Sequence, residues 1–228
     1  MKIFYDGCSI STYASNPNVV GFTTNTSIMK SSNQLNYKQF YESHKERING
    51  RPISLQIFSD DKEVIRQQAQ DIHSLGPSIY VKIPIVTSTG DSLLPLINEL
   101  RNEGIMVNIT AVCTKSQLDD IRLFLSSDCN VPTIVSVFAG RISDTGVNPK
   151  EMVAYAVKVL KGLPHVEILW AGVRDNLVFD LAKEIGCHIV TIPDAVISRM
   201  HRLGTSFDGL STEVVGSFLK DGQALSIL

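Results

Sequence analysis

The feature of this sequence that most constrains its fold is an alternation of short apolar runs with longer amphipathic stretches, repeated about eight times. The short runs are rich in β-branched residues and almost continuously apolar, as is typical of strands buried on both faces of a parallel sheet. They predict eight strands, at Ile3–Tyr5, Val19–Phe22, Ile53–Phe58, Ile79–Ile83, Met106–Thr110, Thr133–Phe138, Val166–Ala171 and His188–Ile192.

The amphipathic stretches between the strands predict helices, at Asn36–Ile48, Asp60–Leu75, Asp91–Arg101, Ser116–Ser126, Pro149–Leu160 and Asn176–Ile185. Gly104 and Gly186 each follow a predicted helix, where glycine commonly ends a helix in a left-handed conformation. Strands and helices that alternate in this way favour an α/β fold, a (β/α)8 TIM barrel. An open doubly wound sheet is the alternative, because periodicity does not show whether a sheet closes.

Length and composition predict one barrel domain spanning residues 1–228, since single α/β barrels commonly run to about 250 residues. Hydrophobic residues make up 43% of the chain, which is enough to build a core. No low-complexity linker divides the sequence. Residues 196–228 carry further helical segments broken at Gly204–Gly209, so we expect a C-terminal helical extension beyond the barrel.

Charge and hydropathy argue against two classes of partner. The formal net charge is −2 and the chain has no basic run, so we expect no nucleic acid and no membrane among its partners. No stretch approaches the ~20 apolar residues of a transmembrane helix, and Asp6 interrupts the N-terminal apolar run too early for a signal peptide. The four cysteines lack Cys-x-x-Cys spacing, which is typical of reduced thiols in a cytoplasmic enzyme.

Chemically useful side chains recur where the predicted strands end, and in a parallel barrel that end carries the active site. Some of them lie two positions apart on one strand and therefore point to the same side. A polar group that points into a barrel is costly unless it is paired or functional. The recurrence across six strands favours a functional site at this end. The residues are Asp6, Thr24, Asn25, Ser54, Gln56, Asn108, Thr110, Phe138, Arg141 and Arg174.

Lys82 is the sharpest candidate, because it interrupts an apolar strand between Val81 and Ile83. Lysine is rarely buried, and desolvation disfavours the ammonium form and so lowers the lysine pKa. A neutral amine can attack a carbonyl carbon, which is the first requirement of Schiff-base catalysis. The alternative is a lysine at a strand end that extends its amine to water.

Five motifs, in this order, resemble those of the transaldolase and fructose-6-phosphate aldolase family. They are Phe4-Tyr5-Asp6, Gly21-Phe22-Thr23-Thr24-Asn25-Thr26-Ser27, Val81-Lys82-Ile83-Pro84, Asn108-Ile109-Thr110 and Phe138-Ala139-Gly140-Arg141. The resemblance extends from Met1 to about Pro193. It implies a (β/α)8 barrel that uses a Schiff-base lysine and requires no metal and no cofactor. The five histidines agree with this expectation, because they show no close pairing of the kind that binds a metal.

The resemblance also implies roles for individual residues. Lys82 would form an imine with the C2 carbonyl of a ketose, and Asp6 would be the general base on the C4 hydroxyl. Gln56 and Thr110 would hold a catalytic water. Substrate hydroxyls would be bound, or Lys82 positioned, by Asn25, Ser54 and Asn108. Thr24 and Phe138 would also contact the substrate.

Arg141 and Arg174 would bind the phosphate of the aldose partner, a role for which guanidinium geometry is suited. Their alternative is a surface ion pair. Ketose and aldose sugar phosphates are therefore the expected partners of the chain, and we expect it to form a homo-oligomer.

Several positions depart from the family pattern. Thr26 replaces a proline, Gly172 stands where a serine usually contacts phosphate, and Trp170 stands where a smaller residue is expected. Gln56 resembles the aldolase branch of the family, whereas Phe138 resembles the transaldolase branch. The active site is therefore a mixture of the two.

Four functions remain compatible with these residues. We expect a transaldolase that moves a three-carbon dihydroxyacetone unit between sugar phosphates. The alternatives are an aldolase that releases free dihydroxyacetone, a phosphate-dependent isomerase or lyase that uses Lys82 only electrostatically, and a non-catalytic barrel used for binding.

Overall fold

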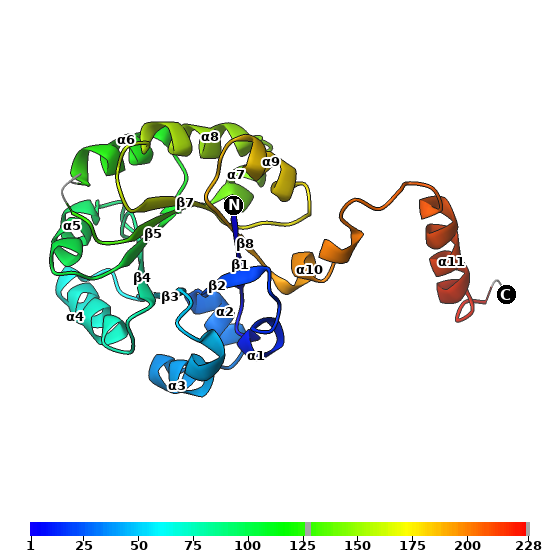
Figure 1. Cartoon of the computed structure of the whole chain (residues 1–228), viewed down its shortest axis with the longest axis horizontal. Coiled ribbons are helices and arrows are strands. Elements are labelled where there is room, and N and C mark those ends of the chain that lie inside the picture. Colours follow the sequence, from blue (N-terminus) through cyan, green and yellow to red (C-terminus); the bar gives the residue numbers. More distant parts are fainter. Residues whose placement is uncertain (126–128, 227–228) are drawn as a thin grey trace.

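A computed structural model describes residues 1–125 and 129–226 and contains a closed barrel of parallel strands in sequential order (Figure 1). The strands are β1 (Lys2–Asp6), β2 (Val19–Thr23), β3 (Ile53–Gln56), β4 (Ile79–Pro84), β5 (Val107–Val112), β6 (Thr133–Val137), β7 (Val166–Trp170) and β8 (Ile189–Ile192). Closure is direct, because β1 pairs with β2 on one side and with β8 on the other. The predicted TIM barrel is confirmed, and the open sheet is excluded.

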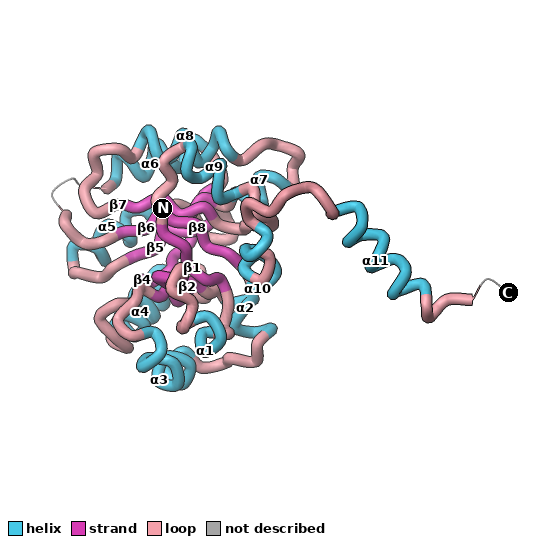
Figure 2. The backbone as a smooth tube through the Cα atoms, turned by 45° about the vertical axis from the view of Figure 1, so that its right-hand side comes forward, coloured by secondary structure: helices cyan, strands magenta, loops and turns pink. Residues whose placement is uncertain are grey.

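The six predicted helices form the outer ring around the strands (Figure 2). They are α3 (Tyr37–Ile48), α4 (Lys62–His73), α5 (Leu94–Asn102), α6 (Lys115–Phe124), α8 (Lys150–Val159) and α9 (Val178–Glu184). Gly104 and Gly186 follow α5 and α9 with φ of 90° and 72°, so both predicted glycine stops are confirmed.

The predicted boundaries differ from the observed ones by up to three residues. The largest error is the start of α5, because Asp91 lies in a turn where its backbone N–H donates to the Thr87 hydroxyl instead of starting the helix. Asp61 caps α4 by accepting from Val64 N, so that helix also starts later than predicted. The predicted end of α6 at Ser126 lies outside the described residues.

Three short helices at the C-terminal ends of the strands were not predicted: α1 (Ile10–Tyr13), α2 (Thr26–Ser31) and α7 (Ala139–Ser143). Each is at most six residues long. A segment of that length shows too little of the 3.6-residue period to be recognised from its pattern. The three helices matter for function because they follow β1, β2 and β6 directly and shape the mouth of the barrel.

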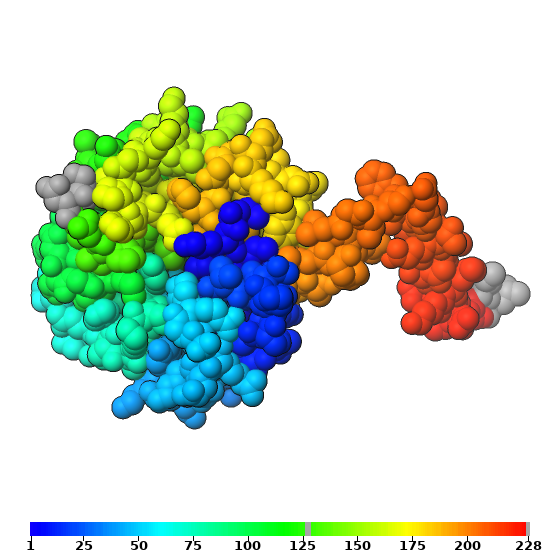
Figure 3. Space-filling model, in the orientation of Figure 1, coloured from blue at the N-terminus to red at the C-terminus, as the bar shows by residue number. Residues whose placement is uncertain are grey.

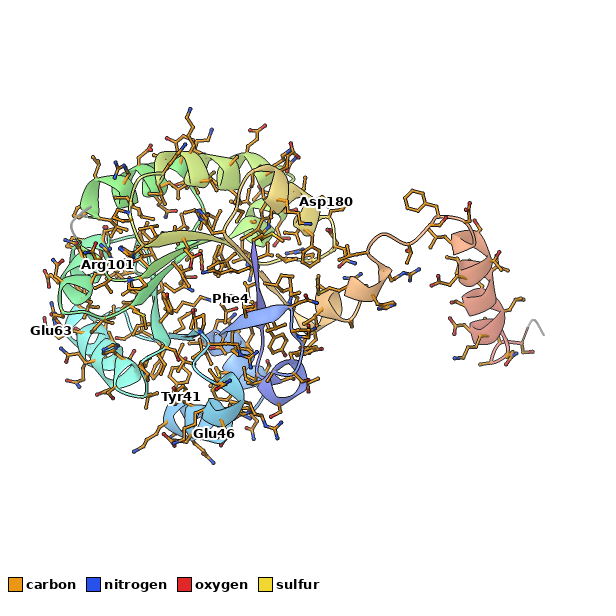
Figure 4. All side chains as sticks on the ribbon, viewed as in Figure 1. Phe4, Tyr41, Glu46, Glu63, Arg101 and Asp180 are labelled. Atoms are coloured by element: carbon orange, nitrogen blue, oxygen red, sulfur yellow. The ribbon has the colours of Figure 1, made fainter. Side chains whose placement is uncertain are left out.

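The core has two parts, one inside the strands and one between the strands and the helices. Phe4 lies inside the ring of strands (Figure 4), where it packs with Ile134, Leu169 and Ile189. The larger part lies outside the strands and is covered by the helices. Arg101 of α5 is fully buried and donates from Nε to the Thr133 hydroxyl at 2.7 Å, so it joins α5 to β6.

The C-terminal segment leaves the barrel as an arm (Figure 3). After α10 (Asp194–Ile197), whose Val196 and Ile197 are buried against the barrel, the arm comprises the 3₁₀ helix η1 (Met200–Arg202) and α11 (Leu210–Gly222). No residue of α11 is buried, and Figures 1 and 2 both show this helix apart from the barrel. Among the described residues, no helix has the length and apolar content needed to cross a bilayer.

Candidate active site

The pairing register of the barrel brings the predicted site residues together at one end. Gln56 of β3 lies opposite Lys82 of β4, and Lys82 lies opposite Asn108 of β5. Thr110 lies opposite Pro84, two positions further toward the C-terminal end of the strands. Side chains two apart on a strand point to one face, so these residues share the barrel interior.

Lys82 is only 4% exposed, and its Nζ donates to the backbone carbonyl of Thr24 at 3.1 Å. Burial lowers the pKa of the Lys82 amine, and the negative charge of Asp6 partly opposes that shift. The amine also lies 6.0 Å from the centroid of the Phe138 ring. Lys82 therefore does not extend to water at the strand end. A buried amine with a lowered pKa has the properties that a Schiff-base nucleophile requires.

Asp6 ends β1 in the same enclosed region. The Thr23 hydroxyl donates to its Oδ1 at 2.7 Å. Burial raises the pKa of Asp6, and the positive charge of Lys82 and the Thr23 hydrogen bond oppose that rise. A carboxyl group with a raised pKa is suited to accept and return a proton during one catalytic cycle.

Asn108 is held by hydroxyl groups on both sides of its amide. Its Nδ2 donates to the Ser54 hydroxyl at 3.0 Å, and the Ser136 hydroxyl donates to its Oδ1 at 2.7 Å. All three side chains are buried. Ser136 was not predicted as a site residue, although it lies two positions before Phe138 in the predicted strand Thr133–Phe138 and could have been recognised by that spacing.

Gln56 and Thr110 are the pair expected to hold a catalytic water. The Thr110 hydroxyl is buried, and no group within residues 1–125 and 129–226 is its hydrogen-bond partner. A buried hydroxyl without a protein partner is commonly satisfied by water. The backbone carbonyl of Gln56 accepts from the Tyr37 hydroxyl at 2.7 Å, which fixes the end of β3.

Thr24 and Asn25 are placed differently from the other expected substrate ligands. The Thr24 hydroxyl donates to the Ser54 carbonyl, so Thr24 meets Lys82 through its backbone and not through its side chain. Asn25 caps α2 by accepting from Ile28 N at 2.9 Å. Thr26 begins this capped helix, which holds the loop in the absence of a proline. Direct substrate contacts by Thr24 and Asn25 stay predictions.

The two predicted phosphate ligands converge on one carboxylate. Arg174 forms an ion pair with Asp144 at 2.6 Å, and Arg141 approaches the other oxygen of that carboxylate at 3.8 Å. Their side chains are 61% and 77% exposed, respectively. The two guanidinium groups are therefore near one another and open to solvent, as an anion site at the barrel mouth requires, and Asp144 is the anion that they meet in this structure.

The backbone explains why Gly172 stands at its position. Gly172 has a φ of 74°, and a Cβ atom there would lie 3.0 Å from the backbone of Gly140. A serine at 172 would thus be strained by both conformation and contact. Trp170 belongs to the core between strands and helices, whereas Leu169 and Ala171 pack inside the barrel. Its indole therefore does not occupy the site, and its size is accommodated among the helices.

The sequence predicts a site without a metal ion. In the described part of the chain, no group of three or more His, Cys, Asp or Glu side chains is arranged to hold a metal ion. The expectation of a site without metal or cofactor stays a prediction.

Comparisons with known proteins give one consistent similarity. A model of the family described as "Transaldolase/Fructose-6-phosphate aldolase" matches residues 3–224. A "Probable transaldolase" from Nitrosopumilus maritimus is 31% identical over 226 residues, covering 97% of this chain and 94% of that protein. A "Probable transaldolase" from Bdellovibrio bacteriovorus is 31% identical over 183 residues, covering 80% of each chain.

Among solved structures, the barrel resembles that of a protein from Coccidioides immitis assigned to the dihydrodipicolinate synthase family. The TM-score is 0.57 at 9% identity, and the match covers 96% of this chain and 71% of that chain. At this identity the likeness shows a shared barrel fold only.

Proposed function

The chain belongs to the transaldolase/fructose-6-phosphate aldolase family, and from this membership we propose that it transfers a three-carbon dihydroxyacetone unit from a ketose phosphate to an aldose phosphate. The observation that carries the proposal is the buried amine of Lys82 in the electrostatic field of the Asp6 carboxylate. The family gives the class, a sugar aldolase or transferase. The named reaction and the residue roles below are our proposal.

The cycle begins with imine formation. The neutral Nζ of Lys82 attacks C2 of the ketose, the carbonyl oxygen is protonated and leaves as water, and a C=N bond remains. A water between Gln56 and Thr110 would carry these protons, because the buried Thr110 hydroxyl has no partner among the described protein groups. The protonated imine then withdraws electrons from C3.

Carbon–carbon cleavage follows from Asp6. Its carboxylate takes the proton of the C4 hydroxyl, the C3–C4 electron pair moves toward the imine, and an aldose phosphate leaves with C4 as its aldehyde carbon. A three-carbon enamine stays on Lys82. In transfer, this enamine attacks an acceptor aldehyde, and Asp6 returns its proton to the new C4 oxygen. Hydrolysis of the imine then releases the new ketose.

Release of free dihydroxyacetone is the second candidate, and Gln56 favours it because it resembles the aldolase branch. Release requires protonation of the enamine carbon and then hydrolysis. A tyrosine hydroxyl at position 138 could order water for these steps, and Phe138 cannot. Phe138 lies 6.0 Å from Lys82, near enough to influence water at the intermediate. We therefore favour transfer.

Incubation with fructose 6-phosphate, with and without an aldose phosphate acceptor, tests this choice. We expect little free dihydroxyacetone in either case and new ketose phosphate only with acceptor. Phe138→Tyr should raise the ratio of release to transfer several-fold, and Phe138→Leu, which also lacks a hydroxyl, should not. Rapid release in the wild type, undiminished by acceptor, would defeat the transaldolase assignment and leave the aldolase.

Arg141→Ala and Arg174→Ala should each raise KM for phosphorylated aldehydes by about tenfold, since a hydrogen bond to a charged group contributes about 1.5–3 kcal/mol and solvent reduces it at exposed sites. KM for the matching unphosphorylated aldehyde should change little. Arg122→Ala, on the exposed side of α6, is the control. Equal effects on KM for the two aldehydes would show that these arginines do not bind the phosphate.

The uncovered arm supports the expected homo-oligomer. Val214, Val215, Phe218 and Leu219 share one side of α11 and are all exposed. A 13-residue helix that packs on nothing is marginal in water. On the barrel, a groove of about 690 Å³ between α2, α3 and α4 exposes apolar side chains, and no residue of the arm lines it. We propose that α11 packs into this groove on a second copy of the chain.

Phe218→Asp should therefore reduce the mass of the particle in solution, measured by light scattering, because a carboxylate would be buried in the contact. Leu35→Asp, in the groove, should have the same effect. Lys220→Asp is the control, because Lys220 is exposed and lies on the side of α11 opposite the four apolar residues. A wild-type monomer, or an unchanged oligomer in both variants, would contradict the proposal.

A further inference from the structure

Two buried threonines connect Asp6 to β8, the strand that closes the barrel by pairing with β1. The Thr23 hydroxyl, on β2, donates to Asp6 Oδ1 at 2.7 Å, and its oxygen lies 2.5 Å from the hydroxyl oxygen of Thr191, on β8. Thr23 is 1% exposed and Thr191 is 3% exposed. The two strands flank β1, where Thr23 lies opposite Asp6 and Thr191 lies opposite Phe4.

The charge of Asp6 decides the direction of both hydrogen bonds. An ionised carboxylate can only accept, and the Thr23 hydroxyl has a single proton to give. That proton is used on Asp6, so the proton between the two hydroxyl oxygens must come from Thr191. The order is therefore Thr191 to Thr23 to Asp6. A hydroxyl that accepts one hydrogen bond becomes a stronger donor in the next.

This order leaves the two oxygens of Asp6 unequal. Oδ1 is held by Thr23. Within the described part of the chain, no protein group donates a hydrogen bond to Oδ2. Apart from the effect of burial, the positive charge of Lys82, from β4, lowers the pKa of Asp6, and the negative charge of Asp6 raises the pKa of the Cys8 thiol in the loop after β1. Oδ2 is consequently the oxygen available to a substrate bound on Lys82.

We propose that Thr191 and Thr23 form a hydroxyl relay that holds Asp6 through Oδ1 and presents Oδ2 to the C4 hydroxyl, so that Thr191 on β8 is a positioning residue for the cleavage step. The inference rests on the proposed function, because it assumes that Asp6 is the general base. It adds two residues to which no role was assigned from sequence.

The relay is tested first without substrate, by ¹³C NMR titration of the labelled Asp6 carboxyl. Removing a donor from the ionised form should raise the Asp6 pKa. We expect a rise of about one unit in Thr23→Val and a smaller rise in Thr191→Val. Thr191→Ser keeps the hydroxyl and should titrate as the wild type does. Lys82 and Cys8 are present in every variant, so their charges do not account for a difference.

The double variant Thr23→Val/Thr191→Val separates a relay from independent packing effects. If the two hydroxyls act in series, the pKa shifts caused by their removal should not be additive. The Asp6 pKa of the double variant should then equal that of Thr23→Val alone. Thermal unfolding of each variant reports packing defects separately. An Asp6 titration in Thr191→Val identical to the wild type, or equal shifts in Thr191→Val and Thr191→Ser, would overturn the relay.

A kinetic experiment measures the rate of fructose 6-phosphate cleavage as a function of pH. A base with a raised pKa is protonated at higher pH. The acidic limb of the kcat–pH profile should therefore move to higher pH in Thr191→Val and have the wild-type position in Thr191→Ser. A shift of one unit is about a tenfold loss of rate on that limb. If the wild type neither cleaves nor forms a trapped adduct, the proposed function fails, and the NMR titration still decides the relay.

Discussion

Lys82→Ala is expected to abolish turnover, with a loss of roughly 10⁴-fold or more, which is the scale seen when a covalent nucleophile is removed. The chain has other lysines, but Lys82 combines near-complete burial with a pKa that burial lowers. Borohydride added with fructose 6-phosphate should reduce the imine and add mass to the peptide that contains Lys82. The same treatment of Lys82→Ala should add none.

Two further variants make this test specific. Lys82→Arg keeps a positive charge near Asp6 but cannot form an imine, so it separates covalent from electrostatic catalysis; activity there would favour the isomerase or lyase alternative. Lys161→Ala removes an exposed lysine and should behave as the wild type does. Because Lys82→Ala leaves the Asp6 carboxyl without its cation, circular dichroism should confirm that the variant is folded. An adduct on another lysine would contradict the assignment.

Asp6→Asn is expected to stop the cycle after imine formation. An amide cannot take the C4 proton, and general base catalysis contributes about 10²–10⁴-fold. Lys82 itself is unchanged, so the imine should still form. Borohydride trapping then gives a direct readout: the wild type should yield adducts that retain six carbons and adducts that retain three, and Asp6→Asn should yield the six-carbon adduct alone.

The matched control is Asp180→Asn, the same substitution on the exposed side of α9 at the outer surface of the barrel (Figure 4). It should form both adducts. Because the positive charge of Lys82 lowers the pKa of Asp6, the opposite charge of Asp6 raises that of Lys82. Asp6→Asn should therefore lower the Lys82 pKa further and shift imine formation to lower pH. If Asp6→Asn formed the three-carbon adduct at the wild-type rate, Asp6 would not be the general base.

The sequence predicted the elements of the barrel better than the connections at its mouth. Eight strands and six helices were predictable because burial imposes a repeated pattern on each of them. The helices α1, α2 and α7 were not, because four to six residues span too little of a helical period. The error at the start of α5 arose from a turn in which the Thr87 hydroxyl accepts from the backbone N–H of Asp91, a local bond from side chain to backbone that competes with helix formation.

The site shows the same division. Lys82 could be singled out because its charge interrupts an apolar strand, and Asp6 because it ends one. Ser136 and Thr191 were missed because a hydroxyl in a strand is compatible with many environments. Arg141 and Arg174 were expected to meet on a substrate phosphate, and in the structure they meet on Asp144. That contact depends on α7, which the pattern did not reveal.

By itself, the sequence determined the class of fold and the chemistry available to it: strands apolar on both faces, a lysine among them and a carboxylate at a strand end. Only the tertiary structure decided which of these groups act on one another. The hydrogen bond between Thr191 and Thr23 joins strands that are far apart in the chain, and it exists because β8 closes on β1 in one register. Composition and periodicity describe each strand alone, whereas register is a property of pairs. The orientation of Asp6 therefore depends on the register in which β8 pairs with β1.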